Sequence, residues 1–273
     1  MAITVDDSFI SQFGDEVKHS YQLESKLFPI VRKRTGVIGS TSRFQKLGAV
    51  SAYTKSRNAD LTVLEPAHTH ADVTLVDHYA TVLVDDLDLL KTNVDIKREY
   101  VETVSKAIAK KIDEIIITAA TAGSTTTTTN AGAMSLARLL EIKAYFDGNS
   151  VEEKDRIVVV GSKTMSDMLA IQQVTSADYQ TTRALVDGSV NTYLGMQIVQ
   201  VPDSYLPLNA AATPDTRVNF AFHKNALGVA VGMEPKVIVE WSPDKHAWWI
   251  KAVVSLGSTI VDGNGVVEFE VDI

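Results

Sequence analysis

The stretch from Asn93 to Ala122, NVDIKREYVETVSKAIAKKIDEIIITAATA, decides the fold. Apolar or small residues recur in steps of three and four at Val101, Val104, Ile108, Ile112, Ile115, Ala119 and Ala122. This spacing aligns them on one face of a helix. Charged residues fall mainly on the other side, among them Asp113 and two pairs at the supportive i,i+4 spacing, Glu102–Lys106 and Lys110–Glu114. We predict a helix about 40 Å long, a spine against which the rest of the chain packs.

The composition excludes several classes of protein. The 273 residues contain no cysteine, which rules out disulfides, thiolate metal sites and thiol nucleophiles. The net charge of −8 argues against a protein that coats nucleic acid. Because the chain has neither a long apolar run nor a signal-like N-terminus, we expect a soluble, non-exported product with no membrane partner.

Residues 1–36 are predicted to form an N-terminal arm. Phe9, Phe13 and Val17 follow one another at four-residue spacing, which indicates a short amphipathic helix. Pro29 and the basic run at 32–34 then favour an extended segment. The basic run could touch nucleic acid, but three charges more often form a solvated or salt-bridged patch.

Residues 37–85 are predicted to form an extended β-hairpin loop. The segments SRFQKLGAVSAYT (42–54) and DVTLVDHYATVLV (72–84) are rich in Val, Thr, Tyr and Leu and alternate partly, as strands do. The polar stretch between them is longer than a compact domain needs, so we expect it to reach outside its own core.

The two legs of this hairpin differ in charge. Residues 18–57 contain nine basic residues and only Glu24 as an acid, whereas residues 58–90 contain seven acidic residues and no Lys or Arg. These charges can pair across the strands of one hairpin, or they can meet the opposite leg, or another acidic surface, of a neighbouring copy; the two arrangements are compatible. The candidate intersubunit contacts are Arg43, Lys46, Lys55, Arg57, Asp60, Glu65, His68, His70 and Asp72.

The remaining chain predicts an α+β fold. After a threonine-rich linker at 122–133, helices are expected after Ser135 and from Ser162, and RIVVVG and TYLGMQIVQVP are expected strands. The last segment, residues 235–273, is predicted to form β-strands throughout, and Asp262-Gly263 predicts a tight hairpin turn.

The sequence contains no convincing catalytic or metal-binding constellation. VVVGSKT (158–164) resembles a phosphate-binding loop, but Ser162 separates Gly161 from Lys163, and Arg156 occupies the position of the first glycine. His68, His70 and Asp72 could hold a metal ion but are explained more simply as part of a solvated loop. Asp85, Asp86 and Asp88 could bind a cation such as calcium but are explained more simply as an acidic segment that leads into the spine helix. We predict no enzyme activity, no metal and no cofactor.

Three segments carry a resemblance to a known family. They are HADVTLVDHYATVLVDDLDLLKTNVDIKREYVETVSKAIAKKID (70–113), FAFHKNALGVAVG (220–232) and GSTIVDGNGVVEFEV (257–271). The first segment contains, in order, a hairpin strand, a run of acidic residues that leads into the spine helix, a Tyr near the start of the helix and an Ala-Ile-Ala segment. Together they resemble the major capsid proteins of tailed bacteriophages, which have the Hong Kong 97-like fold.

The resemblance implies a division into an N-terminal arm (1–36), an extended loop (37–85), a peripheral domain with the spine helix (86–125 and 226–273) and an axial domain (126–225). It implies assembly as hexamers and pentamers into an icosahedral shell around packaged double-stranded DNA, in a virion assembled in the host cytoplasm. A portal protein and, because the arm is short, a separate scaffolding protein are expected partners, with non-specific contact to DNA.

Three alternatives are considered beside this interpretation. An encapsulin-like shell would enclose enzymes in place of DNA. A decoration or tail component would be another structural part of a virion. A soluble α/β enzyme, built on the β-α-β region at 150–230, belongs to a different class and would remain a monomer of about 30 kDa.

The charge difference between the hairpin legs predicts that self-association weakens as salt rises, because counterions screen exposed charges. Light scattering at low and high ionic strength measures the rate of assembly. Equal rates at the two ionic strengths would contradict the intersubunit alternative.

Overall fold

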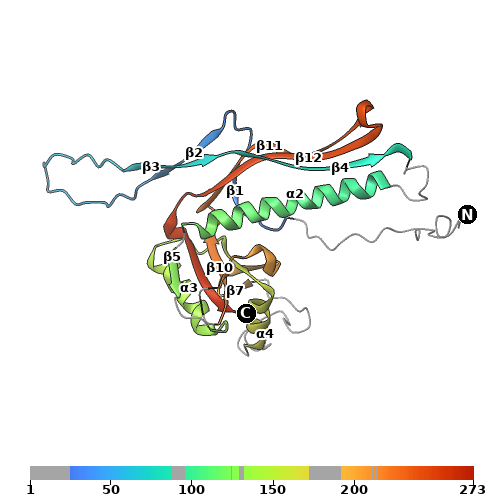
Figure 1. The fold of residues 1–273 in the computed structure, drawn as a ribbon. Coiled ribbons are helices and arrows are strands. Elements are labelled where there is room, and N and C mark those ends of the chain that lie inside the picture. The colour runs from blue at the N-terminus through green and yellow to red at the C-terminus, as the bar shows by residue number, and fades with distance from the viewer. Residues whose placement is uncertain are drawn as a thin grey trace, which may run out of the picture.

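The computed structural model describes residues 25–87, 96–123, 125–128, 132–171, 192–210, 212 and 214–273. The predicted helix around Phe9–Val17 and the acidic residue Asp88 lie outside these residues. A long helix, α2 (Ile96–Thr121), runs along a long sheet, and a second sheet with two shorter helices lies beside one end of α2 (Figure 1). A two-stranded hairpin projects from the same end of the long sheet (Figure 1).

The long sheet has four strands in the order β1-β11-β12-β4. β11 (Leu227–Ser242), β12 (Ala247–Ile260) and β4 (Val76–Asp85) are antiparallel neighbours, while the short β1 (Arg32–Arg34) pairs in parallel with β11. A short 3₁₀ turn, η2 (Pro243–Lys245), joins the two longest strands. Because successive side chains of β12 point to opposite faces of the sheet, Ile250, Ala252 and Val254 all face α2, where they are buried with its apolar side chains.

The smaller sheet brings together strands from distant parts of the chain. Its order is β5 (Thr125–Thr128), β13 (Val266–Asp272), β10 (Thr216–His223), β6 (Arg156–Val160), β8 (Met196–Gln200) and β7 (Thr192–Tyr193), and β9 (Leu208–Asn209) pairs beside β10. The remaining helices within the described residues are α3 (Leu136–Gly148), α4 (Ser162–Ala170) and the 3₁₀ turns η1 (Asp203–Tyr205) and η3 (Gly263–Gly265).

Both faces of the smaller sheet are buried. Along β6, Ile157 and Val159 belong to the core shared with α2, whereas Val158 and Val160 belong to a second core with α3 and α4. All five residues of β6 are buried, as expected for a strand covered on both sides. This confirms the strand predicted for RIVVVG and shows that it is buried.

The predicted spine helix is confirmed, with one correction to its buried face. Val104, Ile108 and Ile112 are buried as predicted, but further along the buried residues are Ile116, Ile117 and Ala120, and Ala122 is exposed. Among the described residues, the first half of α2 packs on the long sheet, and the buried face rotates where further segments cover the helix. Its second half is also covered by the smaller sheet and by the segment around Leu27.

The assignment of Asp113 to the polar face is wrong. Asp113 is 2% exposed, and its carboxylate accepts hydrogen bonds from the Ser25 hydroxyl (2.6 Å) and from the backbone N–H groups of Lys26 (3.1 Å) and Leu27 (3.2 Å). Its burial therefore fixes the start of the described chain to the middle of the spine. Desolvation raises the pKa of Asp113, although these hydrogen bonds act in the opposite direction.

The predicted hairpin at Asp262-Gly263 is also wrong. The turn exists as η3, where the Asp262 side chain accepts a hydrogen bond from the Asn264 N–H. However, β12 before the turn lies in the long sheet, and β13 after it pairs with β10 and β5 in the smaller sheet. The turn therefore passes the chain from one sheet to the other.

The hairpin β2 (Thr41–Leu47) and β3 (His68–Thr74) is shorter than predicted, because the segment SRFQKLGAVSAYT leaves strand conformation after Leu47. Its base is fixed where Phe44 and Val73 pack against Ala230 of β11. Gly257 of β12 lies so close to β3 that a Cβ at this position would come within 2.2 Å of the Thr74 carbonyl oxygen.

We expect Gly257→Ala to destabilise the subunit by about 1–3 kcal/mol, because the Cβ would push against the backbone of β3. Denaturant unfolding of the unassembled chain measures this loss. The matched control is Gly263→Ala, where the added Cβ meets no atom within 4 Å. Equal midpoints for the two variants would show that β3 does not depend on this close contact.

The raised pKa of Asp113 predicts a pH dependence of stability. The folded chain holds this proton more tightly than the unfolded chain, whose carboxyl titrates near its ordinary pKa of about 4. The contribution of Asp113 to stability is therefore complete below that value and is lost as pH rises through the folded pKa. Asp113→Asn should flatten the dependence of unfolding free energy on pH above about 4, and an unchanged slope would contradict this assignment.

Candidate assembly surfaces

The hairpin β2–β3 carries a loop, residues 48–67, that extends away from both cores (Figure 1). The strands pair in antiparallel register from Thr41 opposite Thr74 to Leu47 opposite His68. Beyond them the Gly48 N–H donates to the Ala67 carbonyl (2.8 Å) and the Tyr53 hydroxyl donates to the Thr62 carbonyl (2.7 Å). The loop is therefore braced by its own hydrogen bonds.

The loop exposes an unusual amount of apolar surface. Val63 is 82% exposed and Leu61 is 74% exposed, and the other large exposed apolar side chains of this region are Leu47, Val50, Tyr53 and Leu64. Exposed apolar side chains gathered on one extended segment are typical of an interaction site, because their contact with water is unfavourable until a partner covers them. We name residues 48–67 the projecting loop.

The structure answers part of the question about charge pairing. Arg43 and Asp72 face each other across the two strands, with Nε and Oδ1 2.8 Å apart, so pairing within one hairpin is confirmed at this position. Lys46 instead pairs with Asp262 in the turn after β12 (2.6 Å). Both contacts are intramolecular and partly solvated, so each contributes less than about 1 kcal/mol to stability.

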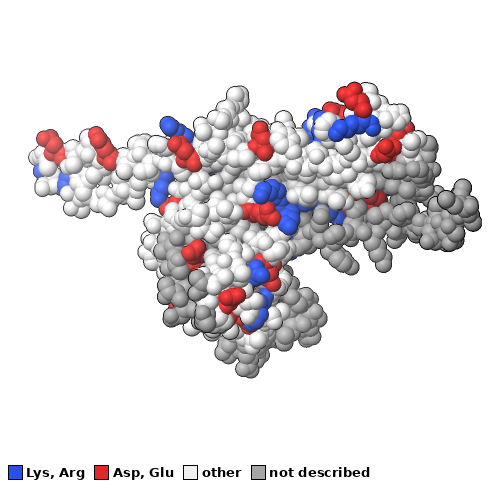
Figure 2. All heavy atoms as spheres, in the orientation of Figure 1, with Lys and Arg blue, Asp and Glu red and all other residues white. Residues whose placement is uncertain are grey.

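The other predicted contact residues lie on the outer part of the hairpin. Lys55 donates to the Ala59 carbonyl within the projecting loop (2.7 Å), and His70 Nε2 lies 3.8 Å from an oxygen of Asp72. The rest are exposed, on the loop or at the start of β3: Arg57, Asp60, Glu65 and His68. The tip of the molecule therefore presents both signs of charge beside its apolar side chains (Figure 2).

A second apolar surface lies on the long sheet, on the face turned away from α2. Tyr79 is 68% exposed. Leu83 and Trp249, which pair directly across β4 and β12, are 42% and 37% exposed. Met233 of β11 adds a further exposed side chain. Sequence reasoning missed this face, because Tyr79 and Leu83 are apolar like the inward-facing Val82 and Val84, and the pattern does not show which of the two sets a helix covers.

The three tryptophans of β11 and β12 lie on both faces of the long sheet. Trp248 is partly buried, donates from Nε1 to Asp86 (3.2 Å) and lies under the Lys97 ammonium, 3.5 Å from the ring centroid. Trp241 contacts the Trp248 ring edge-on, with centroids 5.2 Å apart. Trp249 points to the opposite face, where Lys251 lies over its ring.

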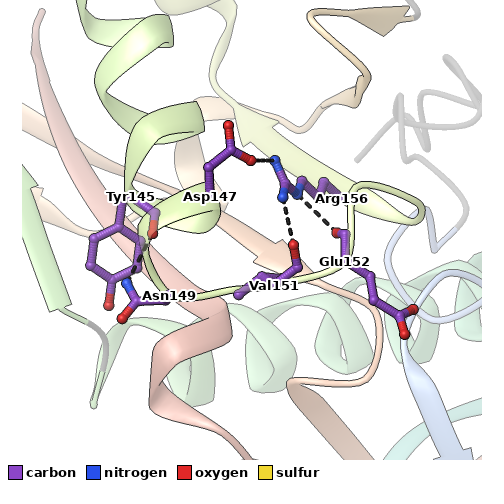
Figure 3. Close-up of polar contacts among 6 residues, drawn as sticks. All are labelled: Tyr145, Asp147, Asn149, Val151, Glu152 and Arg156. Atoms are coloured by element: carbon purple, nitrogen blue, oxygen red, sulfur yellow. Dashed lines mark hydrogen bonds and ion pairs between the residues drawn. The ribbon is translucent and has the colours of Figure 1, made fainter.

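The loop that resembled a phosphate-binding motif has a structural role. The Gly161 N–H donates to the Asn219 side chain (2.9 Å) and the Ser162 N–H donates to Asp203 (2.7 Å), so these amides are already occupied. The buried Arg156 donates to Asp147 (2.7 Å) and to the carbonyl oxygens of Glu152 (2.9 Å) and Val151 (2.6 Å), which ties the end of α3 to β6 (Figure 3).

Among the residues that the structure describes, no three His, Asp or Glu side chains are grouped so that they could hold a metal ion. None of the described helices is long and apolar enough to span a membrane.

Comparison with known structures shows the fold. A structure from Mycobacterium phage Che8 is similar with a TM-score of 0.75 at 20% identity, covering 97% of each chain. The capsid structure of cyanophage P-SCSP1u is similar with a TM-score of 0.76 at 18% identity, over 96% of this chain and 93% of that one. The fold is therefore the predicted mixed helix-and-sheet, Hong Kong 97-like fold.

Comparison of sequences shows the family. The chain is 25% identical over 246 residues to the major capsid protein of Enterobacteria phage T3, covering 77% of this chain and 68% of that protein. The family model described as phage capsid protein matches residues 5–272. This chain belongs to the phage capsid protein family, and its class is that of virion structural proteins.

The contrast between the two arginines predicts a contrast in stability. Arg156→Met should cost about 2–4 kcal/mol, because it removes a buried guanidinium together with its hydrogen bonds to Asp147, Val151 and Glu152. Arg43→Met, which removes an exposed guanidinium of the same size, should cost at most about 1 kcal/mol. Thermal or denaturant unfolding of the two variants measures the difference, and equal losses would contradict the structural role of Arg156.

Proposed function

We propose that this chain is a major capsid subunit whose copies assemble as hexamers and pentamers into an icosahedral shell around packaged double-stranded DNA. The observation that carries the proposal is the projecting loop, with Leu61 and Val63 largely exposed at a distance from both cores. A segment that has no core of its own needs an external partner to bury its apolar side chains. Membership of the phage capsid family favours a second copy of the chain as that partner.

Each projecting loop would overlie a neighbouring copy and cover the exposed face of its long sheet, around Tyr79 and Trp249. One feature of the two surfaces supports this pairing. Both surfaces combine apolar side chains with charges of both signs: Lys55, Arg57, Asp60 and Glu65 on the loop, and Asp77, Glu240 and Lys251 near the sheet face. A single contact of this kind can be weak, because a closed shell repeats it many times.

The division of the chain follows the same proposal. Residues 1–36 would act as an arm, 37–85 as the extended loop, 86–125 and 226–273 as the peripheral domain, and 126–225 as the axial domain. The separation of the strands into a long sheet and a smaller sheet supports a peripheral and an axial domain. β13 is an exception, because it falls within the proposed peripheral domain but pairs within the smaller sheet. The candidate contacts from Arg43 to Asp72 would lie between copies, except where Arg43 and Lys46 already have partners in their own chain.

The expected partners follow from a shell that holds DNA. A portal protein would provide the entrance for the genome, and a separate scaffolding protein would direct assembly in the host cytoplasm. Contact with DNA would be non-specific, since the chain carries a net charge of −8 and phosphate binding needs basic surface. We assign no catalytic role, no metal and no cofactor to the subunit.

Replacing the apolar tip should block assembly and leave the fold intact. Leu61→Ser combined with Val63→Ser removes apolar area that the folded subunit does not bury, so the unfolding midpoint should stay within about 0.5 kcal/mol of the parent chain. Electron microscopy and light scattering should then show subunits where the parent chain forms large particles.

The matched control is Ile273→Ser, which removes another exposed apolar side chain, at the end of the smaller sheet. It should assemble like the parent chain. Full assembly of the loop variant would contradict the role of the projecting loop, and a monomeric parent chain at every concentration would contradict the shell itself.

A further inference from the structure

A pocket with a volume of about 630 Å³ lies where the second half of α2, the long sheet and the segment around η1 meet. We name it the spine pocket. Its α2 wall includes a row of side chains in steps of four, three and four: Lys111, Ile115, Thr118 and Ala122. The other walls come from β4, β12 and residues 204–207. Pockets of roughly 300–1,000 Å³ are of the size that holds small organic molecules.

The walls of the spine pocket are mainly apolar. Leu256 of β12 and Leu206 after η1 are buried, and Ile115 and Ala119 of α2 are half-buried. An apolar molecule that enters the pocket leaves water on the sides of the helix, the sheet and the η1 segment, which is favourable. The lining therefore favours a ligand with an apolar body.

Three polar groups in the lining have no hydrogen-bond partner among the described residues. The Ser258 hydroxyl is buried without a hydrogen bond. The His78 imidazole and the Tyr205 hydroxyl also make none. Because a polar group shielded from water is unfavourable until it is paired, these groups favour a ligand that brings a hydrogen-bonding atom into the pocket.

The Tyr205 hydroxyl can donate such a hydrogen bond. Desolvation raises the pKa of Tyr205, and the negative charges of Asp113 and Glu114 raise it further. The phenol therefore keeps its proton at neutral and mildly alkaline pH.

The charged side chains at the pocket neutralise each other. The Lys111 ammonium lies 3.3 Å from the Glu114 carboxylate, and the Lys110 ammonium lies 3.8 Å from the same group. A charged ligand would have to separate these pairs or place its own charge against the apolar walls, and both are unfavourable. The pocket therefore favours an uncharged ligand.

We propose that the spine pocket binds an uncharged, largely apolar small molecule that carries a hydrogen-bonding group. The apolar body lies against Ile115, Ala119 and Leu256, and the hydrogen-bonding group lies within reach of the unpaired polar groups of the lining. Because the walls belong to the spine, the long sheet and the η1 segment, the bound molecule braces the two sheets against each other. This inference concerns the single subunit and does not rest on shell assembly.

A matched pair of fluorescent probes tests the proposal. N-phenyl-1-naphthylamine is uncharged, has one N–H donor and becomes fluorescent when it leaves water, and its 8-sulfonate derivative adds a negative charge to the same rings. The purified, unassembled chain should bind the uncharged probe with a stoichiometry of one to one. The affinity should exceed that for the sulfonate by about tenfold or more, because the sulfonate finds no unpaired cation.

Variants of α2 locate the probe. Ala119→Phe places a ring inside the pocket and should weaken binding of the uncharged probe by about tenfold or more. The matched control is Ala109→Phe, the same substitution outside the spine pocket on the same helix, which should change the affinity by less than about twofold. If Ala119→Phe does not fold by circular dichroism, Ala122→Phe at the exposed end of the row provides the same test.

The projecting loop could also attract an apolar probe, so Leu61→Ser combined with Val63→Ser completes the set. This variant should bind the probe like the parent chain. Absence of saturable binding, equal affinity for the two probes, or unchanged affinity in the pocket-filling variant would overturn the proposal. Loss of binding in the loop variant would also overturn it, because the probe would then occupy the projecting loop.

Discussion

The burial of one helix by two sheets is the constraint on which the rest of the structure depends. A single core cluster contains Ile108 and Ile116 of α2, Ile250 and Val254 of the long sheet, and Phe220 and Phe222 of the smaller sheet. Each sheet buries one face on α2, so neither can move without exposing apolar area that α2 now covers. The segment with Leu27 and Val31 completes this core. The result is a rigid body with one projecting loop.

The projecting loop has the opposite physical character. Its strands are fixed at their base by Phe44 and Val73, but the residues beyond Gly48 bury no large side chain. Its conformation depends on a few internal hydrogen bonds, and its apolar side chains face water. Such a segment gains most of its stabilisation from outside the chain, which suits a subunit whose function is to bind its own copies.

The sequence predicted the parts of the fold that depend on local pattern. The spacing of Val104, Ile108 and Ile112 identified the spine, and the pairs Glu102–Lys106 and Lys110–Glu114 are present as predicted. The length of the polar stretch after Leu47 predicted an outreaching loop. Features that depend on distant contacts were missed. The pattern of α2 cannot show that Ser25, 88 residues away, returns to bury Asp113.

The turn at Asp262-Gly263 shows the same limit. A turn sequence predicts that the chain reverses, but the sheet joined by the next strand is decided by the cores on either side. Val266, Val267 and Phe269 are divided between the two cores, which places β13 in the smaller sheet. The exposed face around Tyr79 was missed for a related reason, since strand alternation does not reveal which face a helix covers.

Amide hydrogen exchange, compared between isolated subunits and assembled particles, tests the central claim most directly. The amides of α2, β11 and β12 should be protected in both states, because the two-sheet core already exists in the subunit. The amides of residues 48–67 should exchange rapidly in the subunit and become protected in the particle. A loop that is already protected in the isolated subunit, or that stays unprotected in the particle, would contradict the account.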